Sequence, residues 1–200
     1  PNGFVADPDV MDTWATSSVT PQIAGGWLED PDLFGRVFPM DLRPQAHDII
    51  RTWLFTTVLR SHIEHDELPW KNAGISGFVT DPDRKKMSKS KGNVVTPMAL
   101  LESHGSDGVR YWSASIRSGS NTTLDATNAN QMKVGRRLAI KLLNAARFAL
   151  MQATPRGPII EPLDRGMLSS LSLLVAESTE QLEAYDYARV LEHTERFFWS

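Results

Sequence analysis

Short apolar runs and helical repeats alternate along the chain up to about residue 115. Residues 37–42 and 73–79 are typical of strands, although Pro39 weakens the first of them. Between these runs, apolar side chains at helical spacing predict a helix from His47 to about Ile63. Strands that alternate with helices predict an α/β fold for this part of the chain.

From about residue 130 the pattern is almost purely helical. Apolar side chains recur about every four residues at Val134, Leu138, Leu142 and Ala145. Prolines and a glycine between residues 151 and 162 break the pattern, and further helices are predicted at 168–182 and 187–199. We therefore expect an α/β domain over residues 1–127, followed over residues 128–200 by the first part of an antiparallel helical bundle.

A polar segment joins the second predicted strand to the next helix. Thr96 and Pro97 have the character of an N-cap and a first helical residue, and they predict a helix that continues to about Leu101. Open α/β sheets bind their ligands where a strand ends in a loop before a helix. The segment between residues 79 and 96 is therefore the expected position for a ligand.

Composition narrows the class of protein further. The chain has 200 residues, 41% of them hydrophobic, with a net charge of −3 and no cysteine. These values exclude a disulfide framework and thiolate metal sites, and they confine any nucleic-acid contact to local patches. No apolar run is long enough to span a bilayer and no signal peptide is evident, so we expect a cytoplasmic protein. The chain starts at Pro1 and stops within a predicted amphipathic helix, so we expect it to be a piece of a longer polypeptide.

The basic loop, residues 83–93, contains the most specific chemistry of the sequence. It combines two serine hydroxyls with five cationic side chains, Arg84, Lys85, Lys86, Lys89 and Lys91. Such a loop repels itself unless an anion lies against it, and its mixture of cations and short hydroxyl donors suits a polyphosphate. A solvated basic turn or a localisation signal is the alternative interpretation.

Within this loop, Lys86-Met87-Ser88-Lys89-Ser90 resembles the KMSKS signature of class I aminoacyl-tRNA synthetases. Four other segments resemble the same family in the same order along the chain, namely residues 9–18, 46–53, 106–112 and 141–148. The resemblance implies the C-terminal half of a class I Rossmann-type catalytic domain, followed by the start of an anticodon-binding bundle. The family's HIGH motif is absent from the sequence, so we expect these 200 residues alone to lack adenylation activity.

Among the members of this family, the chain is most similar to the valyl enzymes. Isoleucyl enzymes have Gln where this chain has Ile49, and the resemblance implies that Trp14, Ile49 and Trp53 contact the amino acid. In this interpretation the flat rings of the two tryptophans line the sides of the amino-acid pocket, and the branched side chain of Ile49 closes its bottom. Two tryptophans in the ordinary hydrophobic core are the alternative. Ala46 and Ala15 depart from the family pattern, which often has Gly and Phe at these positions.

The resemblance also implies how ATP would be bound. Lys86 and Lys89 would stabilise negative charge on the departing β,γ-phosphates, and Ser88 and Ser90 would hold the loop or donate hydrogen bonds. Met87 would complete the ATP-binding residues, and Asp48 would bind ribose hydroxyls. Mg²⁺ would accompany ATP as part of the substrate, and no metal bound by the protein itself is predicted.

The implied partners are ATP, L-valine and tRNA(Val), acting with a monomeric full-length enzyme and no membrane. The stripe Lys133, Arg137 and Lys141 would meet tRNA phosphates, or it is a solvated helix face. An isoleucyl enzyme and a non-catalytic tRNA-binding paralogue remain alternatives. His62, His65 and Asp66 have the spacing of a metal site but lack further ligands, so we expect them to cap a helix end.

Overall fold

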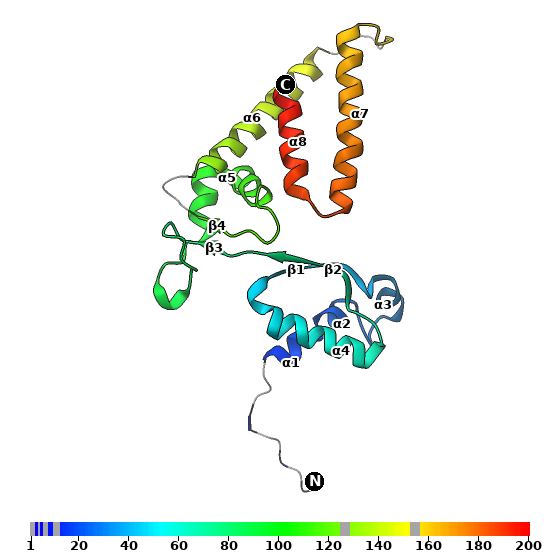
Figure 1. The fold of residues 1–200 in the computed structure, drawn as a ribbon, viewed down its shortest axis with the longest axis vertical. Helices are drawn as coiled ribbons and strands as arrows, with labels where there is room; N and C mark the ends of the chain where they lie inside the picture. Colours follow the sequence, from blue (N-terminus) through cyan, green and yellow to red (C-terminus); the bar gives the residue numbers. More distant parts are fainter. Residues whose placement is uncertain (1–2, 4, 6–7, 10–12, 125–128, 153–156) are drawn as a thin grey trace. The chain divides into compact units, whose positions relative to one another are not determined.

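The computed structural model describes residues 3, 5, 8–9, 13–124, 129–152 and 157–200. The chain divides into two compact units, Pro1–Gly77 and Phe78–Ser200 (Figure 1). The predicted domain boundary at residues 127 and 128 lies outside the described residues, and it stays a prediction. None of the helices in the described part of the chain is long and apolar enough to cross a membrane.

The first unit contains a parallel pair of strands. Strand β1 (Met40–Ala46) pairs with β2 (Trp70–Ser76), from Met40 opposite Trp70 to Ala46 opposite Ser76. Parallel strands require a long connection, which helices usually supply. Here it consists of a 3₁₀ turn, a π-helical turn and an α-helix: η1 (His47–Ile49), η2 (Ile50–Leu54) and α4 (Phe55–His65). The predicted helix and the α/β class of this region are confirmed.

In the described part of the chain, the sheet is preceded by the short helices α1 (Thr13–Ser17), α2 (Thr20–Ala24) and α3 (Pro31–Val37). Helix α3 begins where Asp30 accepts a 3.0 Å hydrogen bond from the backbone N–H of Leu33, with Pro31 as its first residue. The strand predicted from residue 37 is therefore wrong at its start. Val37 ends this helix, and β1 begins only at Met40.

The second unit begins with the parallel strands β3 (Val79–Thr80) and β4 (Thr122–Thr123). The basic loop, which contains the short 3₁₀ turn η3 (Lys89–Lys91), and helix α5 (Pro97–Ala114) connect them. Thr96 and Pro97 flank the start of α5 as predicted, although the Thr96 side chain makes no capping hydrogen bond. The helix extends well beyond Leu101, across an interruption at Gly105, where φ is +75°.

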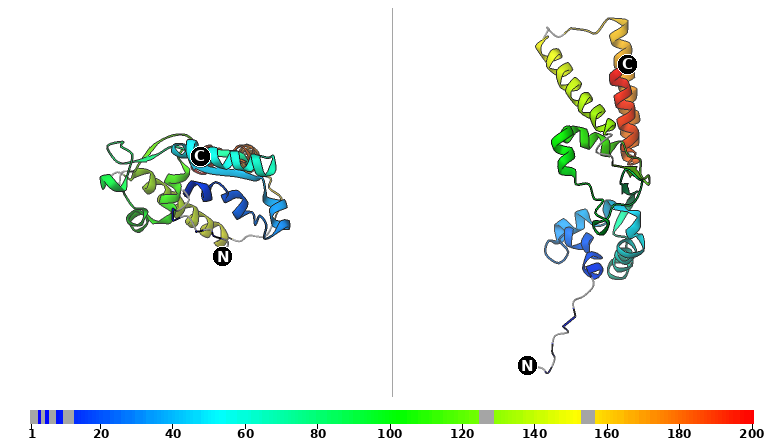
Figure 2. Two further views of the ribbon diagram at one scale, coloured as in Figure 1. Left: turned by 90° about the horizontal axis from the view of Figure 1, so that it is seen from below. Right: turned by 90° about the vertical axis from the view of Figure 1, so that its left-hand side faces the viewer.

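Three long helices follow, namely α6 (Asn130–Met151), α7 (Pro162–Glu183) and α8 (Tyr187–Trp199). Helices α7 and α8 lie side by side as an antiparallel hairpin (Figures 1 and 2). All three helices predicted for this region are confirmed, and α8 has the predicted bounds. The apolar core of the unit joins β4, α5 and α6 through Leu100, Leu124, Ala129 and Met132.

Two glycines allow α5 and α6 to cross closely. A Cβ added at Gly135 would lie 2.3 Å from Cβ of Tyr111, and one at Gly108 would lie 2.6 Å from the carbonyl oxygen of Met132. These separations are too short for any side chain. The crossing therefore depends on glycine at both positions, and it packs α6 against α5, the helix that follows the basic loop.

Candidate functional site

The basic loop begins in a tight turn that Asp81 closes. The backbone N–H of Asp81 donates to the carbonyl of Lys85 at 2.9 Å, and the backbone N–H of Lys85 donates to Asp81 Oδ1 at 2.8 Å. Lys86 then forms an isolated antiparallel bridge with Thr80 on β3. The backbone of Lys86, the first lysine of the motif, is therefore paired with the end of strand β3.

Asn93 connects the far end of the loop to this base. Its side-chain oxygen accepts a 2.9 Å hydrogen bond from the backbone N–H of Ser88. Its Nδ2 donates to Asp81 Oδ2 at 2.8 Å and to the carbonyl of Lys86 at 3.4 Å. Hydrogen bonds from Asn93 and from the Lys85 N–H stabilise the Asp81 carboxylate and lower its pKa, although Asp81 is only 8% exposed.

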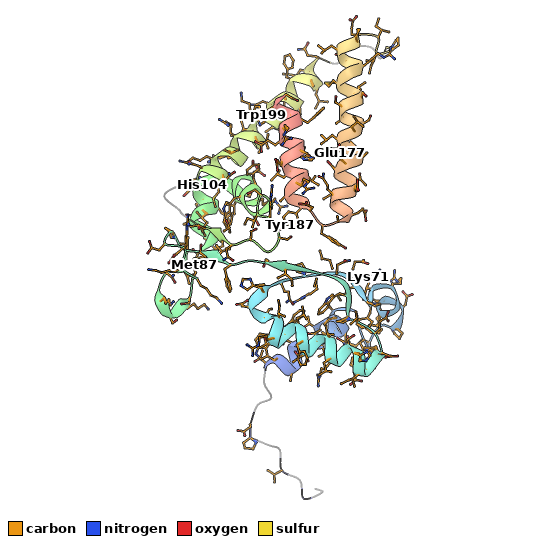
Figure 3. All side chains as sticks on the ribbon, viewed as in Figure 1. Lys71, Met87, His104, Glu177, Tyr187 and Trp199 are labelled. Carbon is orange, nitrogen blue, oxygen red and sulfur yellow. The ribbon has the colours of Figure 1, made fainter. Side chains whose placement is uncertain are left out.

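Met87 anchors the middle of the motif to the core of the second unit. The half-buried side chain packs against the cluster of Leu100, Leu124, Ala129 and Met132 (Met87 is labelled in Figure 3). Its sulfur also accepts a 3.5 Å hydrogen bond from the backbone N–H of Val95. In this structure Met87 therefore fixes the loop on the protein, and its contact with ATP stays a prediction.

The tip of the loop, residues 89–92, is exposed to solvent. It is a single 3₁₀ turn that Gly92 ends at φ +67°, a conformation that glycine adopts without strain. The hydroxyls of Ser88 and Ser90 lie 3.3 Å apart. Lys89 projects from this turn, whereas the ammonium of Lys86 lies 4.1 Å from the centroid of the Phe78 ring. The two lysines and two hydroxyls of the motif thus come together on one short loop.

In the first unit, Asp48 and Ile49 directly follow the carboxyl end of β1. Asp48 is exposed in the turn η1, and Ile49 beside it is half-buried. The preceding residue, His47, holds this turn against β2, because its Nδ1 lies 3.2 Å from the carbonyl oxygen of Ser76. The position fits the rule that open parallel sheets bind ligands at the carboxyl ends of their strands.

Trp53 is in the hydrophobic core. The side chain is 3% exposed, its ring is stacked on Trp70 with centroids 5.5 Å apart, and Cζ of Arg43 lies 3.7 Å from the ring centroid. Its Nε1–H donates to the carbonyl of Ser17 at 2.9 Å. Trp14 on α1 is 37% exposed, so it offers the larger accessible surface of the two. Trp14 belongs to the segment 9–18 that resembles the synthetase family, and residues 10–12 of that segment lie outside the described residues.

The predicted cationic stripe lines one side of an open groove between α5 and α6. The groove has a volume of about 410 Å³ and is lined by Ser103, His104, Lys133, Arg136, Arg137, Ile140 and Lys141. Arg136 also donates to the carbonyl of Ser103 at 3.2 Å. His104, which is labelled in Figure 3, lines the groove from the neighbouring helix α5. The helical spacing of α6 did not reveal His104 or Arg136, because only the crossing of the two helices brings them into this groove.

A polar contact holds α8 against α5. The Tyr111 hydroxyl donates to Glu195, and the Nε1–H of Trp199 (labelled in Figure 3) donates to the same carboxylate at 3.3 Å. Burial and the Glu195 carboxylate together raise the pKa of Tyr111 to about 12. A longer ion pair joins Arg117 to Glu192 at 3.6 Å. The helical hairpin is therefore tied to the segment that follows the basic loop.

The two histidines at the end of α4 have different environments. Nδ1 of His62 lies 3.6 Å from Oδ1 of Asp66, which ends the helix in a left-handed conformation. His65 instead packs against the rings of Trp27, Phe34 and Phe38. Across the described ranges, no group of three or more His, Cys, Asp and Glu residues is placed to hold a metal ion.

Comparison with known proteins identifies the family. The model of the family "tRNA synthetases class I (I, L, M and V)" matches residues 2–125. The chain is 65% identical over 205 residues to a valine–tRNA ligase of Thermobifida fusca, and 64% identical over 207 residues to one of Salinispora arenicola. These alignments cover all of this chain but only 23% and 24% of the relatives. The chain thus spans about a quarter of the length of these relatives.

Solved structures support the same fold. A leucyl-tRNA synthetase of Agrobacterium radiobacter, in complex with tRNA and LeuAMS, matches 96% of the chain with a TM-score of 0.81 at 20% identity. A methionyl-tRNA synthetase of Mycobacterium tuberculosis, in complex with methionyl-adenylate, matches 92% with a TM-score of 0.73 at 26% identity. The match covers 27% of the first structure and 37% of the second. The fold is that of a class I synthetase, and the chain belongs to the class I tRNA synthetase family.

Proposed function

We propose that this chain is part of a valine–tRNA ligase, which activates valine with ATP and transfers it to tRNA(Val). The observation that carries this proposal is identity of up to 65% over the whole chain to proteins named valine–tRNA ligase. The geometry of the basic loop supports it, since a loop anchored at its base presents lysines and hydroxyls to solvent at its tip. The full-length enzyme would act in the cytoplasm as a monomer.

In the first step, the carboxylate of valine attacks the α-phosphorus of ATP and pyrophosphate leaves. Negative charge then builds up on the β- and γ-phosphates, and a fixed cation near them lowers the energy of the transition state. Lys89 at the tip would approach these phosphates together with Lys86, and the hydroxyls of Ser88 and Ser90 would donate hydrogen bonds. Mg²⁺ would reach the site with ATP and neutralise part of the same charge.

The first unit would supply the contacts to ribose and amino acid. Asp48, which is exposed after β1, would accept hydrogen bonds from ribose hydroxyls. Ile49 would limit the size of the side chain that fits the pocket, with Trp14 as an accessible wall. Trp53 would support this pocket from the core, because its ring is already covered by Trp70 and Arg43.

Selection of valine cannot depend on such a pocket alone. The valyl enzymes are themselves an established example of a hydrophobic site that rejects the isosteric threonine only about a hundredfold. A hydrolytic editing domain, and the segment with the HIGH motif, would therefore belong to the same enzyme.

The groove between α5 and α6 would bind the tRNA backbone. Lys133, Arg137 and Lys141 line it together with Arg136 and His104, so several positive charges face one open surface. Contacts of lysine and arginine to phosphates give affinity that falls with salt and depends little on base sequence. The solvated helix face is the alternative for these residues.

Replacement of Ile49 by glutamine tests the assignment of the amino acid. In the full-length protein we expect I49Q to lower kcat/KM for valine in ATP–pyrophosphate exchange by about tenfold or more, because it places a polar amide in an apolar pocket. The exposed Ile50 beside it serves as the matched control, so I50Q should leave this value nearly unchanged. An isoleucyl enzyme would instead exchange more efficiently with isoleucine, and a non-catalytic paralogue would not exchange at all.

A further inference from the structure

Four hydrogen bonds at the base of the basic loop involve only two side chains, Asp81 and Asn93. Asp81 accepts from the backbone N–H of Lys85 and from Asn93, and Asn93 also joins the backbones of Lys86 and Ser88. Neither residue belongs to the five-residue motif. Both are shielded from water, since Asp81 is buried and Asn93 is half-buried in an otherwise exposed segment.

These contacts divide the loop into two parts. Residues 86–88 are fixed by Asn93, by the bridge to Thr80 and by the packing of Met87. The tip, residues 89–92, is instead held by two 3.2 Å backbone hydrogen bonds, from Lys91 to Ser88 and from Gly92 to Lys89. A polar loop with many cations has little apolar surface to order it, so hydrogen bonds at its base largely determine where its side chains point.

We propose that Asp81 and Asn93 form a clamp that positions Lys86 and Ser88 for the polyphosphate. This inference rests on the proposed function of the basic loop. Asp81 and Asn93 are positioning residues, because the hydrogen bonds that they make hold the backbone of the loop. The clamp requires an amide opposite a carboxylate. Asn93 donates through Nδ2 to Asp81 and accepts through Oδ1 from Ser88, and an ionised carboxylate could not do both because it has no donor.

Exchanging the two side chains tests the clamp. N93D alone places a carboxylate against the Asp81 carboxylate, across a contact that is now a 2.8 Å hydrogen bond. The double variant D81N/N93D restores one donor and one acceptor across the same contact, with Lys85 N–H and Ser88 N–H still accepted by the side-chain oxygens at positions 81 and 93. The matched control is N121A, because Asn121 Oδ1 also accepts a 2.8 Å backbone hydrogen bond, from Phe78, outside the loop.

The first measurement is tryptic cleavage of the full-length protein within the basic loop, which does not depend on catalysis. We expect N93D to accelerate cleavage at the lysines of the loop by about tenfold or more, because a broken buried network opens the loop more often. D81N/N93D should return the rate most of the way to that of the unmodified protein, and N121A should not change it. Equal cleavage of N93D and the unmodified protein, or equal cleavage of N93D and D81N/N93D, would overturn the clamp.

The second measurement is valine-dependent ATP–pyrophosphate exchange by the same proteins. A misplaced loop loses contacts that matter most in the transition state, so N93D should lower kcat by about tenfold or more with a smaller change in KM for ATP. D81N/N93D should recover most of kcat. An increase in KM for ATP with kcat unchanged in N93D, or no recovery of kcat in the double variant, contradicts the positioning role. Absence of exchange by the unmodified protein would refute the proposed function instead, and the cleavage rates would then decide the clamp by themselves.

Discussion

Lys86 and Lys89 belong to one motif but have different surroundings. The Lys86 ammonium lies 4.1 Å from the Phe78 ring centroid, and Lys89 extends from the exposed tip. A cation–π contact at an exposed site contributes about 0.5–1 kcal/mol, so a polyphosphate can readily displace the ring as the partner of the ammonium. Lys89 can therefore approach ATP directly. The ammonium of Lys86 would first have to leave the Phe78 ring before it could contact phosphate oxygens.

Substitution of Lys89 tests this assignment at the scale of one residue. K89A in the full-length protein should lower kcat of ATP–pyrophosphate exchange by about a hundredfold, the typical cost of removing one group that stabilises transition-state charge. Lys91 provides the control, because it is an exposed cation of the same loop outside the motif. A loss in K91A as large as that in K89A would show that only the total charge of the loop matters.

Tyr111 permits a test that depends on pH. Its pKa is raised to about 12, so the folded protein keeps the phenol proton where the unfolded chain, with a pKa of about 10, has lost it. The stabilising contribution of Tyr111 is therefore fully present below pH 10 and is lost as the pH rises towards 12. Ultraviolet titration should show one tyrosine that ionises near pH 12 and is missing in Y111F. Ionisation of Tyr111 near pH 10 would contradict its contact with Glu195.

Among individual residues, the sequence motif predicted Lys86, Ser88, Lys89 and Ser90 but not the side chains that hold them. Asn93 and Asp81 resemble ordinary turn residues in sequence, and their role depends on a contact across 12 positions. The contact of Trp53 with the amino acid stays a prediction. Its stacking on Trp70 from β2, which buries the ring, could not be predicted from the resemblance.

At the scale of elements, the crossing of α5 and α6 leaves no room for a side chain at Gly135. A methyl group at Gly135 would lie 2.3 Å from Cβ of Tyr111, so G135A should destabilise the chain by about 1–3 kcal/mol through overpacking. Gly166 on α7 has no atom within 4 Å of the same position. G166A should therefore stabilise the chain, by up to about 1 kcal/mol, because alanine favours helix.

Denaturant unfolding of the two glycine variants, compared with the unmodified chain, measures both effects. Destabilisation by G135A and stabilisation by G166A are expected together. Stabilisation by G135A would mean that α5 and α6 do not cross as closely as the structure has them.

Helices were predicted more accurately than strands, for a physical reason. Helix α8 repeats its apolar positions over three turns, so the helix and its start at Tyr187 could be read from the sequence. The run at residues 37–42 was too short to distinguish the end of a helix from the start of a strand. The signal that resolves it, Asp30 followed by Pro31, lies at the other end of α3, seven residues upstream of Val37.

At the scale of the whole molecule, the order of strands and helices predicted the α/β class and the helical hairpin that follows it. The pairing of β3 with β4 could not be predicted, since each strand is only two residues long and 42 positions separate Thr80 from Thr122. The groove between α5 and α6 was equally hidden, because it forms only where glycines let two distant segments meet.

The proposed function makes this chain part of an enzyme that activates valine. The most direct measurement is ATP–pyrophosphate exchange by the full-length protein with valine, isoleucine, leucine and methionine as separate substrates. We predict that kcat/KM is highest for valine, and that the 200-residue chain alone does not catalyse exchange, since its sequence lacks the HIGH motif. A higher kcat/KM for another of these amino acids, or no exchange with any of them by the full-length protein, would contradict the proposed function.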